Sequence, residues 1–350
     1  MNKSTHGIYF EEFELGVSFV HPGPRTITSG DVAFYIAATG SRFALSSSNE
    51  FATLLGYHAA PIDDVLAFNM VFGRTVPISL NSVANLGYAE CRFIKNLYPG
   101  DTITATTKII GLKQNSSGKT GIVYYRTRAM NQYGDPVMEF VRWEMIRKRD
   151  VDSPAPKTVI PELAEAVVPK DLPTDRLGDW RDYDYPLAGS PHAWEDYQLG
   201  ERIDHIDGIT LDEAEHVMIT RLYQNTSNIH INQFTSTKER FGRRLVYGGH
   251  VISLARALSF NGLQNAQTLL AINGGAHCAP SFAGDTVFAW SEVLDKAELP
   301  GRSDVGALRL RLVAVKERFC NDFPYKNEDG SYADGVVLDF DYWAAIPRRQ

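Results

Sequence analysis

Apolar and polar residues alternate, or β-branched and aromatic residues cluster, in six segments that Gly, Pro, Asn and Asp residues separate. This pattern is typical of β-strands. The predicted strands are residues 102–112, 121–130, 136–145, 286–294, 307–315 and 336–344. Three of them lie in each half of the chain, so we expect each half to be rich in β-structure.

Helical spacing of apolar residues precedes the strands in each half. In the second half, Thr210 and Glu213 predict a capping box at a helix start, and Thr28 with Asp31 is the counterpart 182 positions earlier. A later helix starts at Gly248 and is apolar on most sides, which predicts that it is buried. This combination of helices and antiparallel strands predicts a sheet wrapped around a helix.

Three short motifs occur twice in the same order. FEEFELG at 10–16 returns as WEDYQLG at 194–200, PGDT at 99–102 returns as AGDT at 283–286, and EFVRW at 139–143 returns as DFDYW at 339–343. The first two pairs are 184 positions apart and the third pair 200. The chain therefore contains one domain twice. A residue that folding requires should occur in both copies, whereas a catalytic residue can occur in only one.

Seven of the seventeen prolines stand between residues 150 and 191, where apolar periodicity is weak. Proline fixes φ and has no N–H, so this segment is expected to be an extended strap that joins two domains. We therefore expect an N-terminal domain at residues 1–150, a Pro-rich linker at 151–191 and a C-terminal domain at 192–350.

The composition narrows the class of protein. With 35 Lys and Arg against 42 Asp and Glu, the formal net charge of −7 argues against nucleic acid or an anionic membrane as the main partner. The three cysteines have no C-x-x-C spacing, which indicates reduced thiols in a cytoplasmic protein and no metal site. No apolar run approaches the ~20 residues of a membrane helix.

The second half holds a proton carrier and a candidate anion site. His230 can move a proton near neutral pH, and Asn225, five residues earlier, can hold a water or a carbonyl oxygen. Asn225 could instead cap the preceding helix. Gly248 and Gly249 begin the apolar helix, where backbone N–H groups and the helix dipole favour developing negative charge. His277 is a further candidate for lining this site.

These segments resemble the MaoC-like (R)-specific enoyl-CoA hydratases, which fold as hot-dog domains. The family motif is an Asp followed five residues later by His, and then F-G-x-R-[IL]-[AV]-H-G, which ends in an oxyanion glycine. His230 stands in the place of the first His, Asn225 in that of the Asp, and Tyr247 in that of the His before Gly248. The resemblance covers both halves and implies an α+β double hot-dog fold, two tandem domains each with an antiparallel sheet around a long helix.

A narrower resemblance, to one branch of that family, runs along the whole chain. It rests on PRTIT at 24–28, GSRFAL at 40–45, GRTVP at 73–77, NLGYA at 85–89 and RLYQNT at 221–226. It implies a hydro-lyase that reversibly hydrates mesaconyl-CoA (2-methylfumaryl-CoA) to β-methylmalyl-CoA without a cofactor. His230 would act as base and acid, Asn225 would orient the water, and the Gly248 N–H would stabilise the thioester enolate.

The first half serves as an internal control. Ser41 and Ser46 fall where the second half has its amide and its histidine, and Asp63 and Asp64 stand where it has its two glycines. Carboxylates at a helix start would repel an anion. We therefore expect the N-terminal domain to be catalytically degenerate, although it can still shape the acyl and CoA pocket.

A dicarboxylic substrate brings a carboxylate that an enclosed site must pair with a cation. Four arginines flank the predicted site and its counterpart, namely Arg42, Arg221, Arg243 and Arg244. Arg244 is favoured because it precedes the oxyanion glycine, although a local carboxylate could occupy it instead. Tyr247 and Gly249 are further candidates for substrate binding.

Other functions stay open at this point. A straight-chain (R)-specific enoyl-CoA hydratase would share the site, a hot-dog thioesterase would share the fold and the CoA pocket, and a noncatalytic acyl-CoA binding module would not need His230. The expected partner is a CoA-thioester substrate, with no nucleic acid, membrane or metal. A cytoplasmic homo-oligomer is also expected, with a dimer favoured.

Overall fold

The structure is a computed structural model that describes residues 3–349. Its ten strands are β1 (Ser18–Thr26), β2 (Ser82–Phe93), β3 (Thr102–Gln114), β4 (Thr120–Met130), β5 (Pro136–Arg147), β6 (Arg202–Thr210), β7 (Thr268–His277), β8 (Thr286–Glu298), β9 (Val305–Lys316) and β10 (Val336–Pro347). They form one antiparallel sheet in the order β1-β3-β4-β5-β2-β7-β10-β9-β8-β6. The halves meet where Cys91 of β2 pairs with Ile272 of β7. From this junction outward, both halves have the same order of equivalent strands.

The six strands predicted from the sequence are confirmed as β3, β4, β5, β8, β9 and β10. The patterns missed the two edge strands, β1 and β6, and the two central strands, β2 and β7. A β-bulge interrupts β1 between His21 and Arg25 and β6 between Asp204 and Gly208, so neither edge strand keeps a simple alternation of buried and exposed residues.

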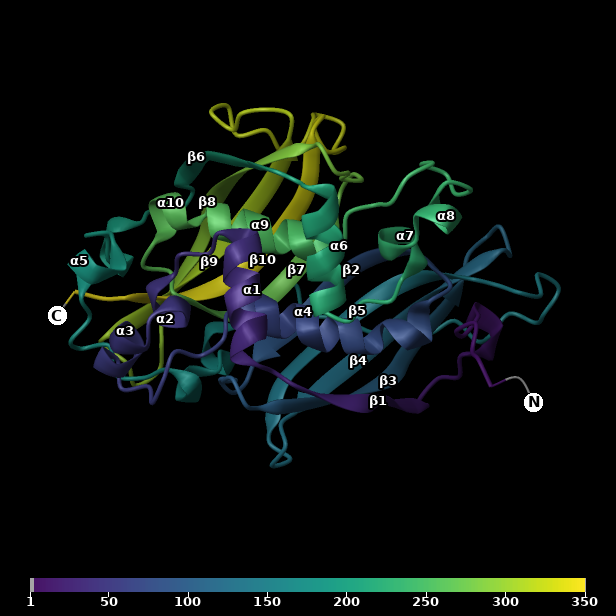
Figure 1. Ribbon diagram of the computed structural model, residues 1–350, viewed down its shortest axis with the longest axis horizontal. Coiled ribbons are helices and arrows are strands. Elements are labelled where there is room, and N and C mark those ends of the chain that lie inside the picture. The colour runs from purple at the N-terminus through teal and green to yellow at the C-terminus, as the bar shows by residue number, and fades with distance from the viewer. Residues whose placement is uncertain (1–2, 350) are drawn as a thin grey trace.

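Two buried helices lie against this sheet, α4 (Asp64–Thr75) and α9 (Gly248–Leu258). The sheet curves behind them, and α1 (Ser29–Thr39) and α6 (Glu213–Leu222) lie over them (Figure 1). Every residue of α9 from Gly249 to Leu258 is buried, as its apolar character predicts. Within residues 3–349, no helix is long and apolar enough to cross a membrane.

Short helices complete the described chain. The α-helical ones are α2 (Ala44–Ser47), α3 (Asn49–Leu54), α5 (Tyr185–Ala188), α7 (Asn228–Ile231), α8 (Gln233–Ser236) and α10 (Phe260–Leu263). The 3₁₀ turns are η1 (Phe10–Glu12), η2 (Val76–Ser79), η3 (Pro169–Asp171), η4 (Thr174–Arg176) and η5 (Trp194–Asp196). The equivalent pairs η1 and η5, β1 and β6, α1 and α6, α2 and α7, and α4 and α9 each begin 184 positions apart.

One of the two predicted capping boxes is present. In α1, the Thr28 hydroxyl oxygen accepts a hydrogen bond from the Asp31 N–H at 3.1 Å, and Asp31 accepts one from the Thr28 N–H at 2.8 Å. The capping box predicted for α6 is wrong. Thr210 ends β6, where its hydroxyl lies 2.9 Å from that of Thr286, and α6 follows Asp212, which makes no side-chain cap. The true offset at this helix is 184 rather than 182.

The segment between the halves runs as a strap that contacts both of them. Val159 and Leu112 of β3 exchange backbone hydrogen bonds of 2.8 and 2.9 Å. Farther along, the buried Arg176 donates to the Asp64 carboxylate at the start of α4, at 2.6 Å, and to the Leu269 carbonyl of β7, at 3.0 Å. The strap therefore ties the first half's central helix to a strand of the second half.

Candidate active site

His230 lies on α7, at the place where α2 carries Ser46 in the first half. Its Nδ1 lies 2.8 Å from the Leu245 carbonyl oxygen. A carbonyl oxygen can only accept, so Nδ1 carries the proton and Nε2 of the neutral ring keeps a lone pair. Burial lowers the pKa of His230 to about 4, against the opposing effect of the Leu245 carbonyl. The ring is therefore a neutral base at pH 7.

The two motif elements of the second half lie against each other. The Leu245 N–H donates to the Ile229 carbonyl at 2.9 Å, directly before the histidine that bonds back to the Leu245 carbonyl. The next N–H, of Val246, donates to the Ser281 carbonyl at 2.9 Å. The bonds of Leu245 hold the segment that leads into α9 beside α7, so His230 lies close to the start of that helix.

Gly248 begins α9 after the N-cap residue Tyr247. The first N–H groups of a helix have no partner within the helix and can bind an anion. A Cβ on Gly248 would lie 2.3 Å from the His277 ring, and a Cβ on Gly249 would lie 1.9 Å from Asn69 Oδ1 of α4. Both positions require glycine because neighbouring side chains approach the backbone closely.

Tyr247 replaces the histidine of the wider motif and lies between the two halves. Its ring centroid is 5.4 Å from that of His230 and 5.9 Å from that of Phe72 on α4. The hydroxyl is buried and has no hydrogen-bond partner within residues 3–349. Burial raises the pKa of Tyr247, so the hydroxyl stays protonated and can donate.

A second imidazole covers the start of α9. His277 Nε2 lies 3.0 Å from the hydroxyl of Tyr88, which β2 of the first half supplies. Burial, with a smaller contribution from charge on His230, lowers the pKa of His277 to about 4. The sequence alone indicates His277 only as a candidate for lining the site. The missed signal is its counterpart 184 positions earlier, Phe93, because an apolar residue there shows that the fold does not need a histidine.

Asn225 is buried in the turn that follows α6. Its side-chain oxygen accepts from the Ser227 N–H at 3.0 Å, and its own N–H donates to the Thr220 carbonyl at 3.1 Å. The described residues show no hydrogen bond between the Asn225 and His230 side chains. Asn225 thus shapes the turn, and its role in holding a water stays a prediction.

The four predicted arginines do not gather around the candidate base. Arg244 forms an ion pair with Glu213 at the start of α6. Arg243 and Arg221 are exposed. Arg42 is exposed as well, and its guanidinium lies 4.6 Å from the ring centroid of Phe260 on α10. Figure 1 shows α10 on the opposite side of α1 from α7.

The equivalent place in the first half lacks both chemical groups. Asp63 caps α4 by accepting from the Val65 N–H at 2.8 Å, and Asp64 pairs with Arg176 at 2.6 Å. Both predicted carboxylates lie at this helix start, and Asp63 occupies its first donors. The offset of 184 places Asp64 opposite Gly248 and Asp63 opposite Tyr247, one position from the predicted match with the two glycines. Ser46, in the histidine's place, only donates to a local carbonyl at 3.3 Å.

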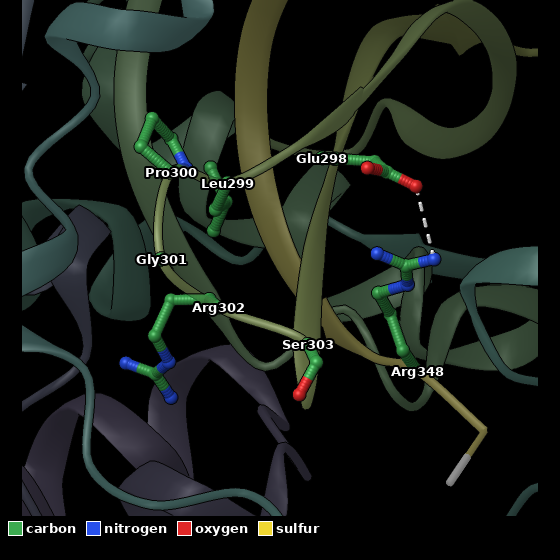
Figure 2. Close-up of a pocket in the computed structure, with 7 residues that line it drawn as sticks. All are labelled: Glu298, Leu299, Pro300, Gly301, Arg302, Ser303 and Arg348. Carbon is green, nitrogen blue, oxygen red and sulfur yellow. Dashed lines mark ion pairs between the residues drawn. The ribbon is translucent and has the colours of Figure 1, made fainter.

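A separate hollow lies at the connection between β8 and β9. Figure 2 shows its lining residues, which are Glu298, Leu299, Pro300, Gly301, Arg302, Ser303 and Arg348. Arg348 pairs with Glu298 at 3.1 Å, and Arg302 pairs with Asp304 at 2.7 Å, so both cations are engaged. It lies near the C-terminus, at the other end of the molecule from α7 (Figure 1). Within residues 3–349, no three His, Cys, Asp or Glu side chains are grouped to hold a metal ion.

Comparison with known proteins decides the family. The family model described as mesaconyl-CoA hydratase matches residues 1–323. The chain is 56% identical over 348 residues to the β-methylmalyl-CoA dehydratase of Chloroflexus aurantiacus and 55% identical over 349 residues to the mesaconyl-CoA hydratase of Cereibacter sphaeroides. These alignments cover 99% of this chain, and 99% and 100% of the relatives. The chain belongs to the mesaconyl-CoA hydratase family.

Solved structures agree with membership of the mesaconyl-CoA hydratase family. A MaoC domain protein dehydratase from Chloroflexus aurantiacus superposes with a TM-score of 0.98 at 54% identity, over 100% of both chains. A Mycobacterium tuberculosis protein with a double hot-dog fold superposes with a TM-score of 0.76 at 24% identity, over 98% of this chain and 99% of that one. The latter match shows the fold alone. The predicted α+β double hot-dog fold is confirmed.

Proposed function

We propose that this protein is the hydro-lyase that reversibly adds water to mesaconyl-CoA to give β-methylmalyl-CoA. The observation that carries the proposal is the Nε2 lone pair of His230, which the Leu245 carbonyl fixes by holding the proton on Nδ1, beside the start of α9. The names of the two relatives supply the substrate pair.

In this proposal one base serves the whole reaction. Nε2 of His230 takes a proton from water as the water oxygen bonds to the β-carbon. The electron pair of the double bond moves toward the thioester, and the Gly248 N–H stabilises the enolate oxygen. His230 then returns its proton to the α-carbon, which restores both the thioester and the neutral base.

Asn225 and the acyl-CoA complete the proposed reaction. An amide cannot take up a proton in this pH range, so Asn225 orients the water while His230 acts as base and then as acid. The CoA thioester itself acidifies the α-position, so we propose that no cofactor takes part. The cytoplasmic location and the dimer stay predictions.

The test is to incubate the purified protein with mesaconyl-CoA and follow loss of the 2-enoyl thioester absorbance, with mass spectrometry of the product. We expect a product heavier by one water, no free CoA with a thiol reagent, and slower turnover of crotonyl-CoA. Release of free CoA would identify a thioesterase, and a preference for crotonyl-CoA would identify a straight-chain hydratase. Binding without turnover would identify a noncatalytic module.

A further inference from the structure

A group of buried polar side chains lies on the inner face of the first half's sheet. Arg142 of β5 is 0% exposed, and the strand register places it directly opposite Tyr88 of β2 and Tyr125 of β4. Two residues along β5, Glu144 stands opposite Asn85 of β2. Residues opposite each other or two apart on a strand share one face of a sheet, so these five side chains form one cluster, the Arg142 cluster.

Many polar atoms of the Arg142 cluster have no partner. Arg142 donates to Glu144 Oε1 from Nη1 at 2.7 Å and to Ser79 Oγ from Nη2 at 3.3 Å. Within residues 3–349, Arg142 Nε, Glu144 Oε2, Tyr125 Oη and both side-chain polar atoms of Asn85 are buried without a hydrogen bond. Buried polar groups are normally paired because each unpaired group costs about 1–3 kcal/mol. Such a concentration indicates a place built for a polar ligand.

The second half shows that the fold does not need these polar groups. Tyr342 of β10 takes the place of Arg142, and its register neighbours are Ile272 and Leu310. Ala344 takes the place of Glu144, and its neighbours are Leu269 and Leu308. The same positions of the same sheet face are therefore almost wholly apolar in the second half.

The Arg142 cluster adjoins the candidate active site. Its member Tyr88 holds the His277 ring that covers the start of α9. The Arg142 guanidinium lies 4.3 Å over the Phe72 ring, which in turn contacts Tyr247 at a centroid distance of 5.9 Å. The charge of Arg142 also lowers the pKa of Tyr88 and of Tyr247, although burial raises both more strongly. This charge therefore reaches the site.

We propose that the Arg142 cluster binds the free carboxylate of a dicarboxylic 2-enoyl-CoA, with Arg142 as the cation. The inference rests on the proposed function. In mesaconyl-CoA the carboxylate is attached to the carbon that receives water, so its receptor must lie next to the site of attack. Glu144 binds Arg142 through Nη1 and leaves the Nε side of the guanidinium available. Two N–H groups on one side of a guanidinium can bind the two oxygens of a carboxylate. The unpaired hydroxyl of Tyr247 and the amide of Asn85 supply further donors.

This assignment differs from the four arginines that sequence analysis named. Arg244 is already paired with Glu213, and Arg42, Arg221 and Arg243 are exposed. An exposed arginine discriminates weakly because water competes for its charge. Arg142 is buried, and burying a substrate carboxylate without a cation is costly, so it offers the sharper discrimination.

The experiment compares two acyl groups that differ only in the carboxylate. The variant is Arg142→Met with Glu144→Gln, because removing Arg142 alone would leave a buried carboxylate unpaired. We expect KM for mesaconyl-CoA to rise roughly a hundredfold, while KM for 2-methylcrotonyl-CoA, which has a methyl group in that place, changes less than about threefold. Equal losses for both acyl-CoAs in a folded variant would overturn the proposal, as would a carboxylate-selective loss in Arg244→Met.

Binding of saturated analogues separates this inference from the proposed function. Methylsuccinyl-CoA and 2-methylbutyryl-CoA cannot be hydrated, so their Kd values test the subsite by calorimetry whether or not the wild type turns over mesaconyl-CoA. We expect the wild type to prefer the dicarboxylic analogue and the double variant to lose that preference. Absence of the preference in the wild type would overturn the inference even if mesaconyl-CoA is hydrated.

Two further variants guard against a folding defect. Asn85→Leu removes a side chain that has no hydrogen bond within the described residues, so it leaves no protein group unpaired. It should raise KM for mesaconyl-CoA several-fold and leave 2-methylcrotonyl-CoA unaffected. The matched control is Arg256→Met, which removes a buried guanidinium that stacks 3.5 Å over Phe43, outside the Arg142 cluster. It should leave the KM ratio of the two substrates unchanged, and a shift equal to that of the double variant would overturn the proposal.

Discussion

The starts of α4 and α9 occupy equivalent positions in the two halves, yet one presents two carboxylates and the other two glycines. In α4 the Asp63 carboxylate accepts from the Val65 and Leu66 N–H groups at 2.8 and 3.4 Å. In α9 the His277 ring lies against Gly248, where a Cβ would meet it at 2.3 Å. Both helices are buried equally well, so the fold requires a helix start there but does not decide what it binds.

The two edge strands, by contrast, carry a histidine at the same position in both halves. His21 and His205 are 184 positions apart, and each Nε2 lies 2.8 Å from a hydroxyl on the neighbouring strand, Thr107 in one half and Ser291 in the other. A histidine present in both copies with the same partner serves the structure. His230 has only Ser46 as a counterpart, which marks it as a residue that the fold does not need.

The largest effect on turnover should follow from replacing His230, which has no histidine counterpart in the first half. His230→Ala should lower kcat by roughly two to four orders of magnitude, because the neutral base is lost. Steady-state rates with mesaconyl-CoA and a thermal melt would measure activity and folding together. Ser46→Ala is the matched control and should stay within a few-fold of the wild type. A His230→Ala protein that keeps more than a tenth of the rate would refute the assignment.

A second effect concerns the helix start of the first half. Arg176→Met would leave the buried Asp64 carboxylate without its cation, and breaking such a pair costs about 3–5 kcal/mol. Urea denaturation should show this loss as a lower midpoint. The control is Arg181→Met, which breaks an exposed pair with Asp179 on the same strap and should change the midpoint little. Equal shifts in both variants would contradict the structural role of Arg176.

The shared histidines predict how stability depends on pH. Burial lowers the pKa of His21 and of His205 to about 4, whereas an unfolded histidine titrates near about 6.5. Between about pH 6.5 and 4 the unfolded chain binds protons that the native chain does not, so stability falls as pH falls through that window. Urea midpoints at several pH values should show the decline, and replacing either histidine by Gln should reduce it. A flat profile from pH 7 to 4 would argue against both buried imidazoles.

The smallest effect on turnover is expected from replacing Asn225. Asn225→Ala should lower kcat by about tenfold, because it removes an orienting hydrogen bond rather than the proton carrier. Asn225→Asp restores the acid of the wider family, and the ratio of its rate to that of Asn225→Ala would show whether a carboxylate can work in this turn. A loss in Asn225→Ala as large as that in His230→Ala would mean that both residues carry the proton.

The repeat explains what could be predicted from the sequence. His230, Gly248 and Asp64 could be singled out because each has a counterpart at a fixed offset, and a difference between copies can be seen without a structure. Arg142 and Tyr88 could not be placed at the site, because their position depends on strand register and on how the first half packs against the second. The pairing of Arg244 with Glu213 depends instead on how the segment before α9 lies against the start of α6 within the second half.

One visible signal was left unused. Arg142 stands in EFVRW, the motif that returns as DFDYW, where the charged Arg142 aligns with the uncharged Tyr342. The edge strands were missed for a different reason, since their β-bulges break the alternation that sequence patterns detect.

The ion pair between Arg176 and Asp64 also bears on evolutionary reversibility. Placing glycine at position 64 would leave the Arg176 guanidinium buried without a carboxylate, and losing Arg176 first would leave the carboxylate without a cation. Either intermediate would lose about 3–5 kcal/mol from a total stability of about 5–15 kcal/mol. Giving α4 a glycine start like that of α9 would thus have to pass through a destabilised protein, and the strap between the duplicated domains prevents that change from being made one substitution at a time.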